Sequence, residues 1–206
     1  MESQMARGGT RWKRFAVVMV PSVAATAAIG VALAQGALAA SFSVSGQEFK
    51  VSAQKLDGTG FLQYGAVDAQ GKNGAVPVAV SAFKSASITG MCQSVVVPVP
   101  VFGDVSMKLT AGGGGTPVQA SNLYIDLDNL NADATFNNIN IGIAAGDNTS
   151  PGMKGGNEKA DPSSFAQEAD SATLTNVQQT AWATSAGTFK LSGLSMHVSK
   201  GDNECY

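Results

Sequence analysis

The chain has 206 residues, of which 13 are Lys or Arg and 15 are Asp or Glu, giving a formal net charge of −2 at pH 7. All three arginines lie near the N-terminus, at Arg7, Arg11 and Arg14. A nucleic-acid-binding surface needs clustered basic side chains to displace counterions from phosphates, so the composition excludes that class of protein, and it excludes recognition of phosphate by guanidinium groups in the rest of the chain.

The first 39 residues have the three parts of a secretory signal. A basic cluster that includes Lys13 precedes an apolar stretch from Phe15 to Leu33, and the small-residue triplet Ala37-Leu38-Ala39 follows it. This order predicts a signal helix that is cut after Ala39, with an uncleaved membrane anchor as the alternative. We therefore expect an exported protein, extracellular or associated with the cell envelope, that contacts a membrane only through this segment if the segment is retained.

Residues 40–206 are expected to form a single β-rich domain, since their length suits one domain. Cleavage removes four of the 13 basic residues and Glu2, which leaves 9 basic and 14 acidic residues and a net charge of −5. No polybasic patch then remains that could hold acidic lipid headgroups.

Short runs of alternating apolar and polar residues dominate this domain. They occur at residues 78–82, 123–127, 139–143 and 194–198. Period-two alternation punctuated by Gly, Asn and Pro is typical of β-strands. Residues 111–117 and 146–159 have the composition of loops. One short helix is predicted in the domain, with Asp161-Pro162 at its start and Ala169 at its end.

A second pattern, apolar-x-(Asn or Gly)-apolar, recurs five times. In a flat strand its two apolar residues would face opposite sides of the sheet. We therefore expect each Asn or Gly to form a bulge or bend with positive φ, which returns the second apolar residue to the core face. Plain β-turns are the alternative. The five instances are Ile88–Met91, Leu127–Leu130, Phe136–Ile139, Leu174–Val177 and Leu191–Leu194.

These patterns predict an all-β fold, either an antiparallel sandwich or a rolled, bulged sheet. A parallel β-helix is the alternative, but it should repeat at a steady coil length. The five patterns are separated by 39, 9, 38 and 17 residues, and this irregular spacing favours antiparallel strands. The concave face of a rolled sheet would offer a groove to an apolar ligand such as a lipid, and we expect Phe136, Leu174 and Leu191 to line that groove.

Cys92 and Cys205 are the two cysteines of the chain. In an exported protein such a pair is typical of a structural disulfide, which would tie the C-terminus to the middle of the chain. A reactive or metal-binding thiol pair is the alternative, with His197 as the one histidine available to it.

The candidate nucleophile is Ser195, two residues before His197. In a strand these two side chains would project from the same face, with their Cα atoms roughly 7 Å apart, which makes them neighbours rather than a hydrogen-bonded pair. The usual Gly-x-Ser-x-Gly turn that presents a catalytic serine is not found after the signal. A polar pair on a solvated sheet face explains the two residues without catalysis.

An oxygen-rich patch could hold calcium. Its order, Asp-x-Asp-x-x-Asn-x-Asp, differs from the twelve-residue calcium loop, which has a glycine at the sixth place and a glutamate at the twelfth. A solvated strand face followed by a turn is the competing interpretation. A zinc site would need three or four N/S ligands, whereas the chain has one histidine and two cysteines that are expected to pair with each other. We therefore expect no cofactor. The patch consists of Asp126, Asp128, Asn131 and Asp133.

Several short motifs along the whole chain resemble those of an exported actinobacterial, chiefly streptomycete, family of unknown function of the DUF6230 type. They are Thr10–Phe15 leading to Val20-Pro21, Tyr64-Gly65, Met91–Val95, Leu123–Asp128 and the ending Glu204-Cys205-Tyr206. The resemblance implies export and residence at the cell envelope. Members of this family often have the automatic label "cholesterol esterase", but no catalytic residue can be transferred to this chain.

Two functions from different classes follow from the sequence. The first is a non-enzymatic envelope protein whose curled sheet shelters a lipid or another apolar small molecule. The second is a lipid-ester hydrolase, similar to a cholesterol esterase, that uses Ser195 and His197. A purely structural surface protein, whose apolar faces are all filled, is a third possibility that suits the low content of charged residues, 14%.

Overall fold

The computed structural model of the chain describes residues 46–70, 74–155 and 160–206. The predicted signal segment lies outside these residues. Within them no helix has the length and apolar character needed to cross a membrane. The strands are β1 (Phe49–Gln70), β2 (Gly74–Thr89), β3 (Met91–Val99), β4 (Gly103–Ala111), β5 (Val118–Asn137), β6 (Asn140–Ala144), β7 (Phe165–Ser185), β8 (Thr188–Lys190) and β9 (Ser195–Lys200), with one 3₁₀ turn, η1 (Ala145–Asp147).

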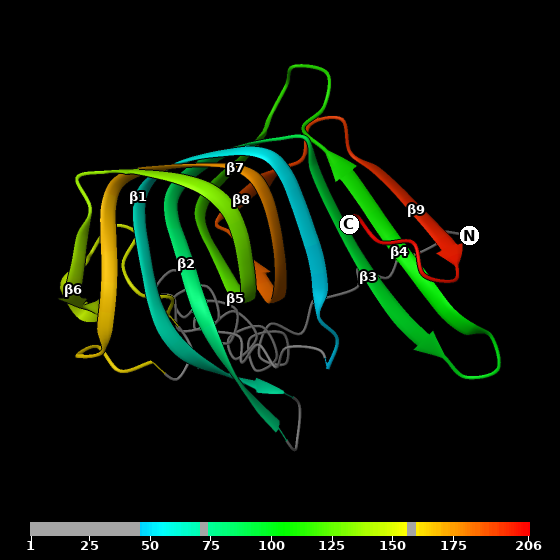
Figure 1. Ribbon diagram of the computed structural model, residues 1–206, viewed down its shortest axis with the longest axis horizontal. Helices are drawn as coiled ribbons and strands as arrows, with labels where there is room; N and C mark the ends of the chain where they lie inside the picture. The colour runs from blue at the N-terminus through cyan, green and yellow to red at the C-terminus, as the bar shows by residue number, and fades with distance from the viewer. Residues whose placement is uncertain (1–45, 71–73, 156–159) are drawn as a thin grey trace, which may run out of the picture. The chain divides into compact units, whose positions relative to one another are not determined.

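Every strand pairing among the described residues is antiparallel, and the strands follow the order β6-β7-β5-β2-β1-β3-β4-β9. The prediction of an all-β antiparallel fold is therefore confirmed, and the parallel β-helix is wrong. In Figure 1 the long strands β1, β2, β5 and β7 curve strongly, so the rolled sheet is the correct one of the two antiparallel alternatives.

The long strands form a closed ring. β1 pairs with β2, β2 with β5, β5 with β7, and β7 returns to pair with β1. The offset of this ring follows from the partners of Gly58. Its partner on β2, Ala86, pairs with Ala120 of β5. Its partner on β7, Ala172, pairs with Phe136 of β5, which is 16 residues away from Ala120. At about 3.3 Å per residue this offset is about 50 Å, against a circumference of about 19 Å for four strands side by side. The strands therefore run more around the axis of the ring than along it.

Two lines of bends allow the strands to curve this tightly. At each bend a residue and the residues opposite it drop out of the ladder while the register on either side is kept, as between Thr59↔Ser85 and Phe61↔Phe83. Two residues that are three positions apart across a bend therefore face the same side of the sheet, which is what the apolar-x-(Asn or Gly)-apolar pattern requires. The first line crosses Gly60, Lys84, Asn122 and Asp170, and the second crosses Gln54, Gly90 and Asn176.

The predicted bend residues can be compared with these lines. Gly90 and Asn176 have φ of 62° and 54°, and the apolar residues on either side of each are buried in one core cluster. In the third pattern, Leu127–Leu130, a shift of register against β7 brings both leucines to the same cavity. The two remaining patterns are turns that follow β5 and β8. The prediction is thus confirmed for the patterns at Gly90 and Asn176, and the turn alternative holds for two others. At Leu127–Leu130 the register shifts without a positive φ at Asn129, and Leu130 stays exposed.

The predicted helix ending at Ala169 is wrong, because β7 already begins at Phe165. The Asp161 carboxylate accepts hydrogen bonds from the backbone N–H and the hydroxyl of Ser163, so it caps a tight turn rather than a helix. From there Ala166, Ala169 and Ala172 are buried in the two apolar clusters of the sheet.

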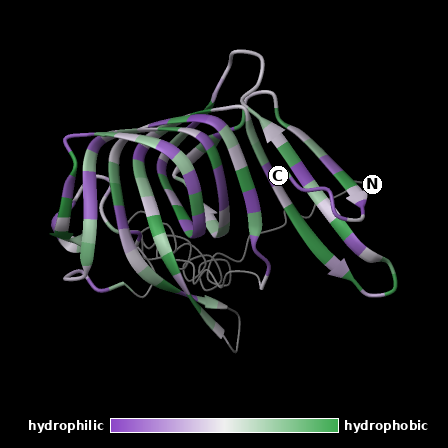
Figure 2. Cartoon of the chain, in the orientation of Figure 1, coloured by the Kyte–Doolittle hydropathy of each residue, from purple (hydrophilic) through white to green (hydrophobic). Residues whose placement is uncertain are grey.

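The ring has an apolar cluster on each face, and Figure 2 shows hydrophobic and hydrophilic residues alternating along the curved strands. The inner cluster includes Phe61, Phe83 and Leu174, which belong to three different strands and line the same cavity. The outer cluster includes Leu62 and Val80, and it is covered by residues of the segment between β6 and β7. Both faces of β1 and β2 are therefore buried over part of their length.

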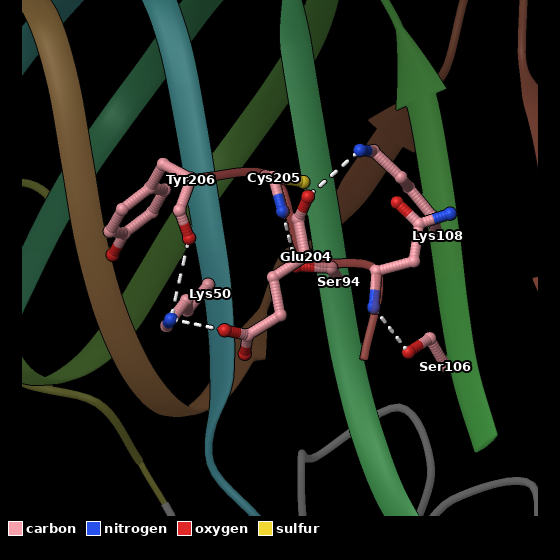
Figure 3. A network of polar contacts seen from close by, with 8 residues as sticks. Lys50, Ser94, Ser106, Lys108, Glu204, Cys205 and Tyr206 are labelled. Carbon is pink, nitrogen blue, oxygen red and sulfur yellow. Dashed lines mark hydrogen bonds and ion pairs between the residues drawn. The ribbon is translucent and has the colours of Figure 1, made fainter. Parts of the chain in front are cut away.

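The strands β3, β4 and β9 extend the sheet beyond the ring, and the C-terminal tail crosses one face of this extension (Figure 3). The backbone N–H of Cys205 donates to the buried Ser94 hydroxyl at 3.0 Å, and that of Asn203 donates to Ser106 at 2.8 Å. Lys50 pairs with the Glu204 carboxylate. Cys92 and Cys205 are joined by a disulfide, with Cα atoms 5.9 Å apart, so the predicted disulfide is confirmed.

Candidate functional site

A cavity of 140 Å³ lies inside the ring. All four strands of the ring line it, and most of its lining is apolar. The rings of Phe61 and Phe136 have centroids 5.0 Å apart, and those of Phe61 and Phe83 are 5.4 Å apart. The lining residues are Leu56, Phe61, Gln63, Ser81, Phe83, Ile125, Leu127, Leu130, Ala132, Ala134, Phe136, Leu174, Val177 and Gln179.

The cavity opens along the second half of β5. Leu130 and Ala134 line it and are nevertheless exposed to solvent. Among the described pairings, β5 is paired on both sides only up to Leu127, and beyond that residue it pairs with β7 alone. An entering molecule would therefore meet Leu130, Ala132 and Ala134 before it reached the phenylalanine rings.

Three polar side chains interrupt the apolar lining. The Gln63 amide donates to the Ser81 hydroxyl at 2.8 Å and accepts a hydrogen bond from Gln167 at 2.5 Å. Gln179 is only 6% exposed, and within the described part of the chain its amide has no hydrogen-bond partner. No Lys, Arg, His, Asp or Glu lines the cavity, so its polar groups are all uncharged.

The outer face of the ring holds a buried charge cluster, composed of Asp68, Asp126 and Lys154. The Lys154 ammonium group is 2.5 Å from Asp126, and the two side chains are 13% and 1% exposed. The backbone N–H of Lys154 donates to the Tyr64 hydroxyl at 2.7 Å, and the Tyr124 hydroxyl donates to the Pro151 carbonyl at 3.2 Å. These bonds fix the segment before β7 against β1 and β5.

Asp68 shares this site with Asp126. Burial raises the pKa of Asp68 to about 6, the negative charge of Asp126 and a hydrogen bond to it add to the rise, and Lys154 opposes it. One carboxylate oxygen of each aspartate is buried without a hydrogen-bond donor among the described residues. A proton on Asp68 makes it a donor, so a single proton can join the two carboxyl groups.

We expect the variant Asp68→Asn to be more stable than the wild type above pH 6. The folded-state pKa of Asp68 lies above the ordinary value of 3.8, so its contribution to stability is present in full below about pH 4 and is lost as the pH rises through 6. Asparagine cannot ionise and retains a donor toward Asp126. Urea unfolding between pH 4 and 7.5 should give a small difference at pH 4 that widens to a plateau above pH 6. Parallel stability curves over this range would show that Asp68 is ionised in the folded protein.

The predicted groove residues separate in the structure. Phe136 and Leu174 line the cavity, whereas Leu191 packs against the inner cluster without lining it. The sequence reasoning missed Phe61 and Phe83, which pair directly across β1 and β2. A signal for them was present, because the two lie nearly symmetrically about the glycine-bounded stretch 71–74, and Phe61 directly follows Gly60 as the second apolar residue of the bend pattern follows its Asn or Gly.

The candidate catalytic pair lies on β9, which contributes no residue to the cavity. Ser195 and His197 are both exposed and pair with Thr110 and Lys108 of β4. Within the described residues no hydrogen bond joins them.

The candidate calcium ligands do not converge. Asp126 is fully buried in the charge cluster, Asp128 is exposed, and Asp133 accepts a hydrogen bond from Asn176 at 2.8 Å. Asn131 is exposed. In the described ranges no three His, Cys, Asp or Glu side chains are grouped so that they could hold a metal ion.

One family model matches the chain, over residues 45–206, and its description is a family of unknown function (DUF6230). No curated protein and no solved structure gives a match.

Proposed function

The chain belongs to the DUF6230 family of unknown function. Because membership in this family does not indicate an activity, we propose a function from the geometry of the structure. The domain is a non-enzymatic, exported protein of the cell envelope that binds a small apolar ligand inside the ring. The observation that carries the proposal is the apolar cavity lined by all four ring strands. The basic, apolar and small-residue order of residues 1–39 supports the export.

The volume limits the size of the ligand. Sites that enclose a drug-sized molecule have volumes of about 300–1,000 Å³, and an apolar cavity of about 150 Å³ accommodates benzene. The cavity, at 140 Å³, suits a small aromatic ring or a short alkyl group. A whole lipid could therefore place only its end inside. Because tightly packed apolar interiors leave few voids larger than a water molecule, a cavity of this size favours binding over a purely structural role.

The variant Ala132→Phe should abolish binding. Ala132 lines the cavity near its mouth, and a phenyl ring there would occupy the space of the ligand. Toluene, used as the probe, should raise the Tm of the wild type because it binds only the folded state. It should leave the Tm of the variant unchanged.

Thr135→Phe is the matched control. Thr135 is an exposed residue of the same strand, β5, and an odd-numbered position there faces away from the cavity, whose lining residues are even-numbered from 130 to 136. It should therefore retain the response to toluene. If toluene changed the Tm of the wild type and of Ala132→Phe equally, the result would contradict the proposal and favour a structural surface protein. Native mass spectrometry of the secreted protein would show cleavage after Ala39 and any ligand that copurifies.

A further inference from the structure

We propose that the ligand of the cavity is an uncharged compound of about six to eight non-hydrogen atoms with one hydroxyl group, which Gln179 binds and Ser81 faces. This inference rests on the proposed function, since it names the chemistry of the molecule that enters the ring.

Gln179 is the first reason for a polar group on the ligand. Its side chain lines the cavity, is 6% exposed, and lies between the buried Val177 and Ala181 on β7. Its amide has no hydrogen-bond partner within residues 46–70, 74–155 and 160–206. The amide is not one of the described polar groups that are sealed from solvent without a partner, so it is open to the cavity. A ligand that filled the cavity without pairing with the amide would leave it unsatisfied, whereas a hydroxyl group can donate to its oxygen and accept from its nitrogen. A hydrocarbon would leave the amide unsatisfied.

Ser81 provides a second polar contact. Its hydroxyl oxygen accepts a hydrogen bond from Gln63, whose own oxygen is engaged by Gln167. This chain of bonds fixes Gln63 and leaves the Ser81 hydroxyl proton free to turn toward the cavity. The polar lining thus offers one amide and one hydroxyl, which suits a single small polar group.

The absence of charge on the lining excludes ions. No cationic or anionic side chain is among the lining residues, so a carboxylate or an ammonium group in the cavity would be buried without a partner, at a large cost in free energy. Fatty acids and amines are therefore disfavoured, and a neutral alcohol is favoured. The three phenylalanines around the cavity suit a ring on the apolar part of the ligand.

The test compares three probes of similar size: benzyl alcohol, toluene and benzoate. By titration calorimetry at pH 7.5 the wild type should bind benzyl alcohol about tenfold more tightly than toluene and should not bind benzoate. The variant Gln179→Met retains the length of the side chain and removes its hydrogen-bonding groups, so it should lose the preference for the alcohol while still binding toluene. Gln178→Met, on the exposed opposite face of β7, is the matched control and should behave as the wild type.

A second measurement does not depend on the fold of a variant. In ¹H–¹⁵N spectra of the wild type, benzyl alcohol should shift the side-chain amide resonances of Gln179 more than toluene does. If toluene binds as tightly as the alcohol and Gln179→Met changes neither affinity, the inference about the hydroxyl fails and the proposed function stands. If no probe binds, both fail.

Discussion

Replacing Cys205 with serine is expected to lower the free energy of unfolding by about 4 kcal/mol. The disulfide joins residues 113 positions apart, and a cross-link over so long a loop restricts the unfolded chain strongly. The tail it anchors also makes hydrogen bonds to Ser94 and Ser106, whose side chains are buried on β3 and β4. Urea unfolding with and without reductant measures the loss.

The double variant Cys92→Ser/Cys205→Ser is the control for this result. It should be as stable as Cys205→Ser alone, because each removes the same cross-link. The reduced wild type should unfold at nearly the same urea concentration as both. An oxidised protein no more stable than its reduced form would show that the tail is held by its polar contacts alone.

The variant Lys154→Met is expected to cost about 3–5 kcal/mol at pH 7.5, because it leaves the buried Asp126 without a counter-charge. Asp126 is 1% exposed and Asp68 lies beside it. Protonation of Asp68, whose pKa is raised by burial and by the charge of Asp126, would relieve part of the loss, so the difference from the wild type should shrink at pH 5. Urea unfolding at the two pH values tests both parts.

Lys84→Met provides the matched control for Lys154→Met. Lys84 is exposed on β2, so the same replacement there should change the stability by less than about 0.5 kcal/mol. A loss below about 1 kcal/mol for Lys154→Met would mean that its ammonium group is solvated, as in surface ion pairs.

The local features of the fold could be predicted from the sequence because their signals are local. Alternation indicated the strands, and the Asn or Gly within the apolar pattern located the bends at Gly90 and Asn176. The disulfide followed from the presence of two cysteines in a chain whose sequence predicts export. The helix ending at Ala169 was predicted wrongly because Asp161-Pro162 starts a turn as readily as a helix.

The closure of the ring and the polar part of the cavity could not be predicted. The pairing of β1 with β7 joins Phe49 to Ala181, and no local pattern indicates which distant strand completes a sheet. Gln179 looks like a surface residue in the sequence, since glutamines are mostly exposed. Asp126 was assigned to a calcium patch because its partner, Lys154, lies in a loop 28 residues away with no spacing rule to link them.

The closed ring has a consequence for how the chain folds while it is being synthesised. β1 lies near the start of the domain and its second neighbour in the ring, β7, lies near the end. A chain that is synthesised from its N-terminus therefore has β1 and β2 complete while β7 does not yet exist, and one edge of β1 stays unpaired during that interval. Such edges are templates for pairing with other chains, and pairing between distant segments is slow. The interval before β7 arrives is thus when the newly made chain is most exposed to aggregation.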